Sequence, residues 1–358
     1  MDSTRAVLAS LPKVELHRHL EGSLRLTTLI ELARQHDLDV PREIDELRRR
    51  VQVTLHDPSC RAFLATFTTL RQFYVSPEVI CRFTREAIED AYLDNVRYME
   101  LRFTPAALSA ARNYPLHEVT RWVVEEVRKT RLELRDMQIA LIASINRHES
   151  LAIAEQVLRI AVDHKEEIVG IDLAGDEAHD PAEPFAGIFR EARCEGLGVV
   201  IHAGEWAGPA AVRYAIEELG ADRIGHGIRI IEDPDIVALA RDRGVSFEVC
   251  PTSNALSGAI RRLRNHPLPR MLALGLKVTI NTDDPAICNV TLTGELAVAM
   301  ETLGLTFGEI KVAMLTAAAN AFQAPVVRES IVERFQNALR GWPAGISQSS
   351  GARQAPLL

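Results

Sequence analysis

The chain has 358 residues, of which 47% are hydrophobic and 25% are charged, and its formal net charge is −8. This composition predicts a globular protein with a large buried core. The acidic balance disfavours a nucleic acid or an anionic membrane surface as partner, because both attract an excess of lysine and arginine, and a small-molecule partner is expected instead. The sequence contains neither a signal-peptide core nor eighteen consecutive uncharged apolar residues, so we expect a cytoplasmic protein without a membrane span.

Short runs rich in β-branched residues alternate along the chain with amphipathic helical stretches. The eight predicted strands are VELHRHL (from Val14), VRYMELRF (Val96), MQIALIASI (Met137), IVGIDLAG (Ile168), GVVIHAG (Gly198), RIGHG (Arg223), VSFEVCP (Val245) and KVTINTDD (Lys277). Strands that alternate with helices predict a parallel sheet covered by helices, and eight such units predict a closed (β/α)8 TIM barrel.

Two segments exceed the minimal barrel. Extra helical sequence, roughly Pro41 to Asp94, separates the first two predicted strands, and a helical end extends from about Thr291 to Arg340. The first segment follows a strand, where barrels place the loops and lids of their active face. We expect residues 1–340 to form one barrel domain and residues 341–358, which are small, polar and proline-bearing, to be a disordered tail.

Two histidines stand two positions apart in the first predicted strand. Side chains at this spacing point to the same face, so His17 and His19 can bind one ion. His202, His226 and Asp283 lie at the carboxyl ends of the fifth, sixth and eighth predicted strands. Because a barrel assembles its active site at these ends, we expect the five side chains to converge there. The pattern predicts a metal site rather than a set of polar core residues.

Imidazoles combined with a carboxylate suit zinc, which accepts nitrogen and oxygen ligands and keeps one position open for water at catalytic sites. Spacing alone leaves open which four of the five side chains bind. The five cysteines are odd in number and form no CxxC pair, which argues against both a disulfide framework and a thiolate zinc site. We expect the remaining histidines, on predicted helices or in loops without a matching strand end, to be solvated or structural. They are His36, His56, His117, His148, His164, His179 and His266.

The stretch HAGEW places a carboxyl group just beyond the fifth predicted strand. Glu205 follows His202 by three residues, and Gly204 lets the backbone turn tightly between them. This position, near the metal but aimed away from it, predicts a proton donor. An acid there needs burial or a proton shared with the substrate to raise its pKa. The alternative is an acid at the start of a helix in GEWAGPAAV.

The stretch NTDDP places two carboxyl groups at the end of the eighth predicted strand. Neighbouring strand residues point in opposite directions, so Asp283 and Asp284 are expected to have different roles. One can bind the metal and hold its water while the other reaches the substrate. The alternative is that TDDP only caps a helix.

Six motifs occur in order along the chain: PKVELHRHLEGS, GIDLAGDE, HAGE, RIGHG, CPTSN and NTDDP. In this order they resemble the adenosine deaminase family of the amidohydrolase superfamily, over roughly Leu11 to Pro325. The resemblance implies a metal-dependent hydrolase with one zinc ion per chain. It further implies purine salvage by hydrolytic deamination of an aminopurine nucleoside.

The resemblance also implies a role for each site residue. The implied zinc ligands are His17, His19, His202 and Asp283, of which His19 also faces the substrate and Asp283 also has a catalytic role. Glu205 would protonate the purine ring at N1, and His226 would orient and deprotonate the water that attacks C6. The tetrahedral intermediate would then lose ammonia and leave a 6-oxo purine.

Further residues are implied to contact the substrate. Asp284 would hydrogen-bond N7, and the backbone N–H of Gly175 would meet N3. The stretch AFLATF would place Phe63, Leu64 and Phe67 over the substrate as an apolar gate. The helical spacing of these three side chains fits core packing equally well.

One position departs from the family pattern. In family members that act on adenosine, the acid after HxHL is usually an aspartate that contacts the ribose 5′-hydroxyl, whereas this chain has Glu21. Relatives with glutamate include enzymes for free adenine or for aminodeoxyfutalosine, so these substrates remain alternatives. GIDLAGDE and NTDDP are closer to the nucleoside pattern, and we therefore expect adenosine and 2′-deoxyadenosine.

Two other classes of function are less consistent with the motifs. A two-metal hydrolase of the same superfamily often bridges its metals with a modified lysine, and IVGIDLAGDE contains no lysine. A non-catalytic barrel that binds purine or metal would not require Glu205 and His226, and both residues are present.

Overall fold

The computed structural model describes residues 3–56 and 58–340, so the predicted tail at 341–358 lies outside the described residues. Eight strands form one sheet in the order of the sequence, and each neighbouring pair is parallel. The strands are β1 (Lys13–His19), β2 (Val96–Phe103), β3 (Gln138–Asn146), β4 (Ile168–Ala174), β5 (Gly198–Ala203), β6 (Arg223–His226), β7 (Ser246–Val249) and β8 (Lys277–Ile280). The predicted (β/α)8 barrel is confirmed.

The seam between the last and the first strand is closed by the segment that follows β8. Strand β8 ends at Ile280, earlier than predicted, and the seam bonds are made by residues beyond it. The Asn281 side chain accepts from Leu16 N at 3.0 Å, and Arg18 forms a parallel bridge with Asp283. The premise that Asp283 and Asp284 alternate on a strand is therefore wrong.

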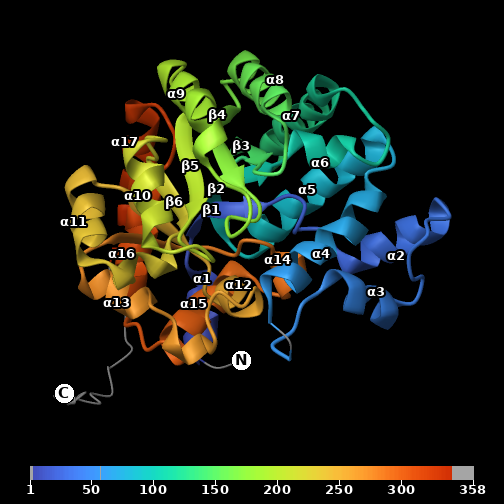
Figure 1. Ribbon diagram of the computed structural model, residues 1–358. Helices are drawn as coiled ribbons and strands as arrows, with labels where there is room; N and C mark the ends of the chain where they lie inside the picture. Colours follow the sequence, from blue (N-terminus) through green and yellow to red (C-terminus); the bar gives the residue numbers. More distant parts are fainter. Residues whose placement is uncertain (1–2, 57, 341–358) are drawn as a thin grey trace.

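Helices surround the barrel, as Figure 1 shows. Those that connect successive strands are α5 (Pro77–Leu93), α6 (Pro105–Ser109), α7 (Leu116–Glu133), α8 (Leu151–Asp163), α9 (Ala186–Cys194), α10 (Pro209–Glu217), α11 (Pro234–Arg243), α12 (Pro251–Leu256) and α13 (Leu268–Ala273). Short 3-10 turns are η1 (Arg71–Phe73), η2 (Glu183–Phe185), η3 (Ile228–Glu232) and η4 (Leu263–Asn265). The inward faces of the helices pack on strands whose residues are almost all buried, which is usual for a parallel sheet.

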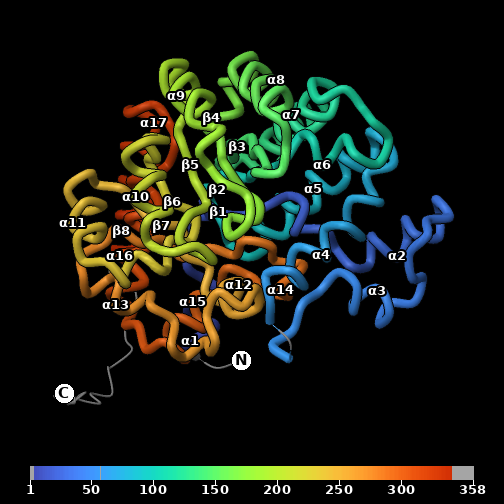
Figure 2. The backbone as a smooth tube through the Cα atoms, in the orientation of Figure 1, coloured from blue at the N-terminus to red at the C-terminus, as the bar shows by residue number. Residues whose placement is uncertain are grey.

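The two expected additions to the barrel are present. Between β1 and β2 the chain forms α2 (Leu26–Gln35), α3 (Ile44–Val51) and α4 (Cys60–Leu70) before α5. After β8 it forms α14 (Pro285–Cys288), α15 (Leu292–Glu301), α16 (Phe307–Ala319) and α17 (Pro325–Ala338), while α1 (Ser3–Ser10) precedes β1. The insertion projects beside the barrel with α4 close to α14, which comes from the other end of the sequence (Figure 2). One hydrogen bond between these segments joins Val53 N to Ile287 O at 3.1 Å.

Local sequence signals fix where the inserted helices begin. Ser59 accepts a hydrogen bond from Ala62 N and caps α4, and Ser76 accepts one from Val79 N and caps α5. Pro77 occupies the first turn of α5, where a missing N–H carries no cost. The Ser59 cap starts α4 so that its apolar side, including Phe63, faces the barrel.

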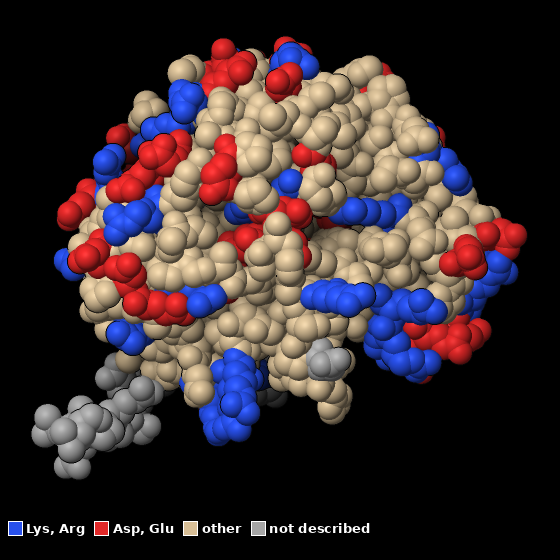
Figure 3. All heavy atoms as spheres, in the orientation of Figure 1, with Lys and Arg blue, Asp and Glu red and all other residues tan. Residues whose placement is uncertain are grey.

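Basic and acidic side chains are interspersed over the face drawn in Figure 3, with acidic groups around a central hollow. Within the described ranges, no helix has both the length and the apolar character to cross a bilayer. All five cysteines are free.

Candidate active site

The five side chains predicted to converge do meet at the carboxyl ends of the strands. Asp283 Oδ1 lies 3.1 Å from His17 Nε2 and 3.3 Å from His19 Nε2. One ligand atom from each of His17, His202, His226 and Asp283 falls within 4.8 Å of the others. His19 is not one of these four, but its Nε2 contacts the same carboxylate oxygen. The four groups can therefore hold one small cation, with His19 beside them.

Closure of the barrel brings the carboxylate to the two histidines of β1. His19 N donates to Asp283 O at 2.8 Å, and Asp283 N donates to His17 O at 2.9 Å. Asp283 has a φ of 63° and His226 a φ of 60°, values that non-glycine residues rarely adopt. Strained backbone of this kind persists where surrounding structure holds it, and it is common at functional sites.

Two of the histidines are oriented by buried carboxylates. His17 Nδ1 lies 2.8 Å from Glu248 Oε2 on β7, and His202 Nδ1 lies 2.9 Å from Asp172 Oδ1 on β4. Each contact leaves Nε2 of the ring directed at the cluster, and His17 Nε2 has no hydrogen-bond partner. A carboxylate on the far nitrogen of a histidine is the usual support of a metal ligand. The arrangement favours His17 and His202 as ligands.

A layer of ion pairs lies beneath the cluster. Arg102 Nη2 is 2.6 Å from Glu248 Oε2, and Arg102 Nη1 is 3.4 Å from Asp172 Oδ2. Arg223 bridges Glu248 and Glu100, and all five side chains are at most 1% exposed. Two guanidinium groups thus face three carboxylates, and the carboxylate at the seam is a fourth. This surplus of negative charge is what a divalent cation neutralises, so the residues fit zinc or a similar ion.

These ion pairs keep the supporting carboxylates charged. Burial by itself raises the pKa of Asp172, but His202 and Arg102 hold that pKa well below its ordinary value. Burial also raises the pKa of Glu248, whereas Arg102 and Arg223 lower it further than burial raises it.

Glu205 lies beyond the end of β5 and is 4% exposed. Its helix-start alternative is wrong, because α10 begins at Pro209 and is preceded by Gly208. The turn depends on Gly204, whose φ is 72° and whose Cβ would meet Val212 Cγ2 at 2.5 Å. Burial raises the pKa of Glu205 well above its ordinary value, and the charges of Asp283 and Glu177 raise it further. The raised pKa favours the protonated form of Glu205.

Asp284 also carries a raised pKa. The cause is first its burial, and then the charges of Asp283, Glu21 and Glu205. It occupies the position before α14 but makes no capping bond, so the helix-cap alternative is wrong, and its Oδ1 atom has no partner. Gly22 allows this approach, since a Cβ there would lie 1.8 Å from Asp284 Oδ1. The glycine after Glu21 thus makes room for a carboxyl group with a raised pKa that lines the pocket.

The remaining predicted contacts line the same pocket, whose volume is about 190 Å³. Glu21 Oε1 accepts from Thr104 N at 2.5 Å, while Oε2 is buried without a partner. Burial raises the pKa of Glu21 to about 7. Phe63 and Phe67 of α4 line the pocket with ring centroids 6.3 Å apart, and Leu64 and Gly175 lie there too.

Several residues of the site were not singled out in the sequence. His148 was expected to be a solvated or structural residue without a matching strand end, but it follows β3 by two residues and lines the pocket together with Arg71. Asp172 and Glu248 carry a signal that could have found them. Each is the one charged residue in an otherwise apolar run that predicts a buried parallel strand. Arg102 carries no such signal, because its run also contains Arg97 and Glu100.

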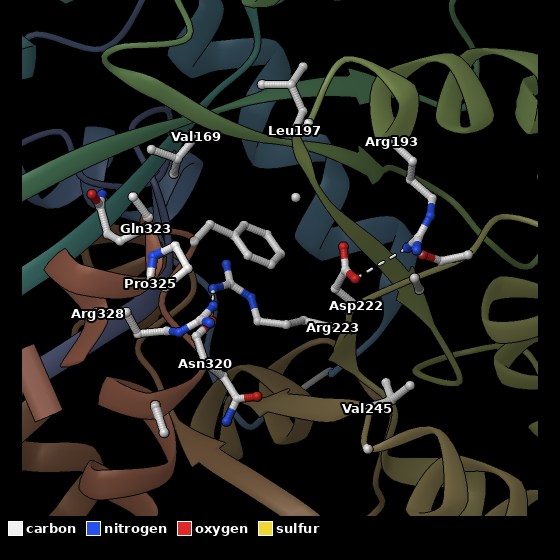
Figure 4. A pocket seen from close by; sticks show the side chains of 18 of the residues that line it. Val169, Arg193, Leu197, Asp222, Arg223, Val245, Asn320, Gln323, Pro325 and Arg328 are labelled. Atoms are coloured by element: carbon white, nitrogen blue, oxygen red, sulfur yellow. Dashed lines mark hydrogen bonds and ion pairs between the residues drawn. The ribbon is translucent and has the colours of Figure 1, made fainter.

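A second and larger hollow, of about 950 Å³, lies at the amino ends of β4, β5 and β6 (Figure 4). Arg223, Arg328 and Phe322 line it, and Arg193 pairs with Asp222 at 3.2 Å at its rim. Its described lining contains no histidine. Size alone therefore does not locate the chemistry, which requires the converging donors at the opposite end of the barrel.

Residues 12–338 match the family model described as adenosine deaminase. The chain belongs to the adenosine deaminase family. It is 35% identical to an adenosine deaminase of Klebsiella pneumoniae (strain 342) over 329 residues, which cover 91% of this chain and 98% of the relative. An adenosine deaminase of Serratia proteamaculans (strain 568) is 35% identical over 332 residues, or 92% and 98% of the two chains. As a member of this family, the chain is a hydrolase of C–N bonds in cyclic amidines.

Solved structures of the adenosine deaminase family and its superfamily share the fold. An adenine deaminase from Arthrobacter aurescens superposes with a TM-score of 0.85 at 27% identity and covers 92% of this chain and 100% of its own. An amidohydrolase from Burkholderia ambifaria with bound Zn has a TM-score of 0.84 at 27% identity, with 95% of both chains covered. The N6-methyl-AMP deaminase of Arabidopsis thaliana has a TM-score of 0.81 at 25% identity and covers 93% and 98%. The adenosine deaminase family is metal-dependent, and the cluster in this chain can hold a metal ion.

Replacing Asp172 by Asn tests the support of the predicted metal site. The amide keeps the shape but removes the negative charge behind His202, so we expect zinc affinity to fall about 10- to 100-fold. Competition with a coloured chelator measures the affinity. Asp163→Asn, at the exposed end of α8, is the control. Equal affinity in the two variants would contradict the proposed role of Asp172.

Replacing Glu295 by Gln tests the effect of a buried acid behind the site. Glu295 Oε2 accepts from Thr252 N at 3.0 Å, and burial raises the pKa of Glu295 from 4.5 to about 7. The folded chain therefore holds this proton more tightly than the unfolded chain, so the contribution of Glu295 to stability falls as pH rises from 4.5 to about 7. Glutamine does not titrate.

We therefore expect the melting temperature of the Glu295→Gln variant, relative to the parent, to rise across this pH window and to level off above it. Thermal unfolding followed by circular dichroism at several pH values measures the difference. The same replacement at exposed Glu195 is the control. A difference that is independent of pH would refute the raised pKa.

Proposed function

We propose that the protein is a zinc-dependent deaminase that converts adenosine and 2′-deoxyadenosine to inosine and 2′-deoxyinosine with release of ammonia. The observation that carries this proposal is that two buried carboxyl groups with raised pKa values, Glu205 and Asp284, line one pocket with the histidine and carboxylate cluster. A 6-aminopurine nucleoside presents three ring nitrogens that accept hydrogen bonds, N1, N3 and N7, and the two buried acids are suited to N1 and N7.

The two acids suit a reaction in which C6 of the purine must lose electron density before water attacks it. The proton of Glu205 goes to N1 of the purine, which draws electrons from C6 and makes that carbon susceptible to attack. Asp284 donates its proton in a hydrogen bond to N7, an atom that can only accept. Since Asp284 must be protonated for this contact, its raised pKa supports the assignment. The N–H of Gly175 would bind N3 from the other side of the ring.

The histidine and carboxylate cluster in the same pocket would bind and activate the attacking water. His17, His19, His202 and Asp283 are the proposed ligands of a zinc ion, which when bound would make water nucleophilic near neutral pH. His226 orients this water toward C6. The water oxygen would bond to C6, and one water proton would pass to the amino group, so that the C6–N bond breaks and ammonia leaves. The other proton of the water would return to Glu205, which leaves a carbonyl at C6 and the hydrogen on N1.

Glu21 helps to determine which aminopurine the protein accepts as its substrate. Its free oxygen, Oε2, can accept a hydrogen bond from the ribose 5′-hydroxyl of a nucleoside. A second candidate is adenine itself, because the structure from Arthrobacter aurescens is named as an adenine deaminase. Phe63 and Phe67 would cover either substrate.

The substrate can be determined with a panel. Adenosine, 2′-deoxyadenosine, adenine, aminodeoxyfutalosine and N6-methyl-AMP are incubated with the zinc-loaded protein, and ammonia and the ultraviolet spectrum are followed. We expect the highest kcat/KM with adenosine and 2′-deoxyadenosine. Preference for adenine would replace the nucleoside assignment, and absence of ammonia with all five compounds would overturn the proposed function.

Replacing Glu205 by Gln tests the proton donor. The amide keeps the hydrogen bonds of the side chain but has no proton to give to N1, so we expect kcat to fall about 10²- to 10⁴-fold with zinc content unchanged. Steady-state kinetics and elemental analysis measure the two quantities. Glu195→Gln, on the surface, should behave like the parent. Retained turnover in Glu205→Gln would exclude Glu205 as the acid.

A further inference from the structure

A chain of hydrogen bonds enters the active site from the loop before α13. Leu268 N donates to His266 Nδ1 at 3.0 Å, and His266 Nε2 lies 3.2 Å from Asn254 Oδ1. Asn254 Nδ2 in turn lies 3.1 Å from Glu205 Oε1 and 3.0 Å from His226 Nδ1. The four side chains are between 0% and 4% exposed, so no bulk water competes for these contacts.

The direction of each bond follows from the backbone group at its outer end. The N–H of Leu268 can only donate, so His266 Nδ1 carries no proton. Burial lowers the pKa of His266 to about 3, which leaves a neutral ring with its single proton on Nε2. That proton is donated to Asn254 Oδ1. His266 thereby determines which way the amide of Asn254 faces.

The reverse orientation of the amide is disfavoured by its neighbours. It would direct the NH2 group of Asn254 at the N–H of His266, so that two donors would meet without an acceptor. It would also remove the bond that Asn254 Nδ2 donates to Glu205 Oε1, and no bulk water reaches these buried groups to replace the lost contacts.

The orientation of Asn254 has consequences at both of its inner contacts. His226 Nδ1 accepts from the amide, so the neutral ring carries its proton on Nε2. That atom lies 3.6 Å from Glu205 Oε2 and 3.8 Å from Asp283 Oδ2, inside the pocket. At Glu205, two donors occupy Oε1, so the acidic proton resides on Oε2, the oxygen on the side of His226.

We propose that Asn254 and His266 are positioning residues: Asn254 sets which atoms of Glu205 and His226 carry their protons, and His266 sets the orientation of Asn254. The inference rests on the proposed function, because it assigns atoms within that reaction. The family resemblance implies that His226 orients and deprotonates the attacking water. A ring with its proton on Nε2 donates a hydrogen bond to that water, so the inference supports the orienting role. It also leaves Oε2, the oxygen nearer His226 Nε2, as the atom of Glu205 that can carry the acidic proton.

Two replacements of His266 separate this role from a local structural one. Gln places an amide N–H where Nε2 was and can still donate to Asn254, but it loses the acceptor for Leu268 N. Asn places an acceptor where Nδ1 was and keeps the bond to Leu268, but it cannot reach Asn254. We expect His266→Gln to keep kcat within a few-fold of the parent and His266→Asn to lose about tenfold or more in kcat with little change in KM.

A double-mutant cycle tests whether His266 acts through Asn254. In an Asn254→Ala background, His266→Asn should cause no further loss of kcat, because there is no amide left to orient. Additive losses would overturn the proposal. A kcat retained by His266→Asn but lost by His266→Gln would overturn it as well, since the bond to Leu268 would then be the important one.

A measurement without substrate keeps this inference separate from the proposed function. Nitrogen NMR of isotope-labelled histidine in the zinc-loaded parent should show His226 with an unprotonated Nδ1, and His266→Asn should populate the other tautomer. Melting temperature and zinc content establish that the variants are folded and loaded. A protein that deaminates no aminopurine but shows this tautomer shift would refute the function and retain the inference, whereas a protonated Nδ1 in the parent would overturn the inference.

Discussion

The buried guanidinium of Arg102 is the interaction on which the site depends. It lies at the centre of the barrel, 2.6 Å from Glu248 and 3.4 Å from Asp172, and these carboxylates contact His17 and His202. An unpaired charge at this depth would be strongly destabilising, so the arginine and the carboxylates fix one another in place. These carboxylates contact Nδ1 of His17 and of His202, so the Nε2 atom of each ring is directed at the cluster.

The second constraint is the closure of the barrel. Strand β8 stops at Ile280, and the residues after it complete the seam with backbone bonds to His17 and His19. Asp283 reaches the histidines because of this irregular closure, at the cost of a left-handed backbone conformation. A regular eighth strand would carry its side chains alternately into and out of the barrel. The turn after β8 thus places both Asp283, in the candidate metal-binding cluster, and Asp284, in the pocket.

Much of this architecture could be predicted, and the exceptions have a common cause. The apolar runs predicted all eight strands, and the spacing of His17 and His19 predicted that they share a face. The surrounding shell was not predicted, because Asp172, Glu248 and Asn254 acquire their roles through contacts with residues 28 to 231 positions away. His148 was missed because it lies two residues beyond the third strand, and its place in the pocket depends on the path of the loop after Asn146.

The sequence by itself determined the barrel, its insertion after the first strand and the convergence of five candidate side chains. The strands follow from hydrophobic periodicity, which is a local property of the chain, and the convergence follows because the carboxyl ends of parallel strands share one edge. Only the tertiary structure decided which groups raise the pKa values of Glu205 and Asp284 and which side chains contact Asn254 and His266. A pKa and a tautomer depend on burial and on neighbouring charges, and those neighbours come from strands and loops far apart in the sequence.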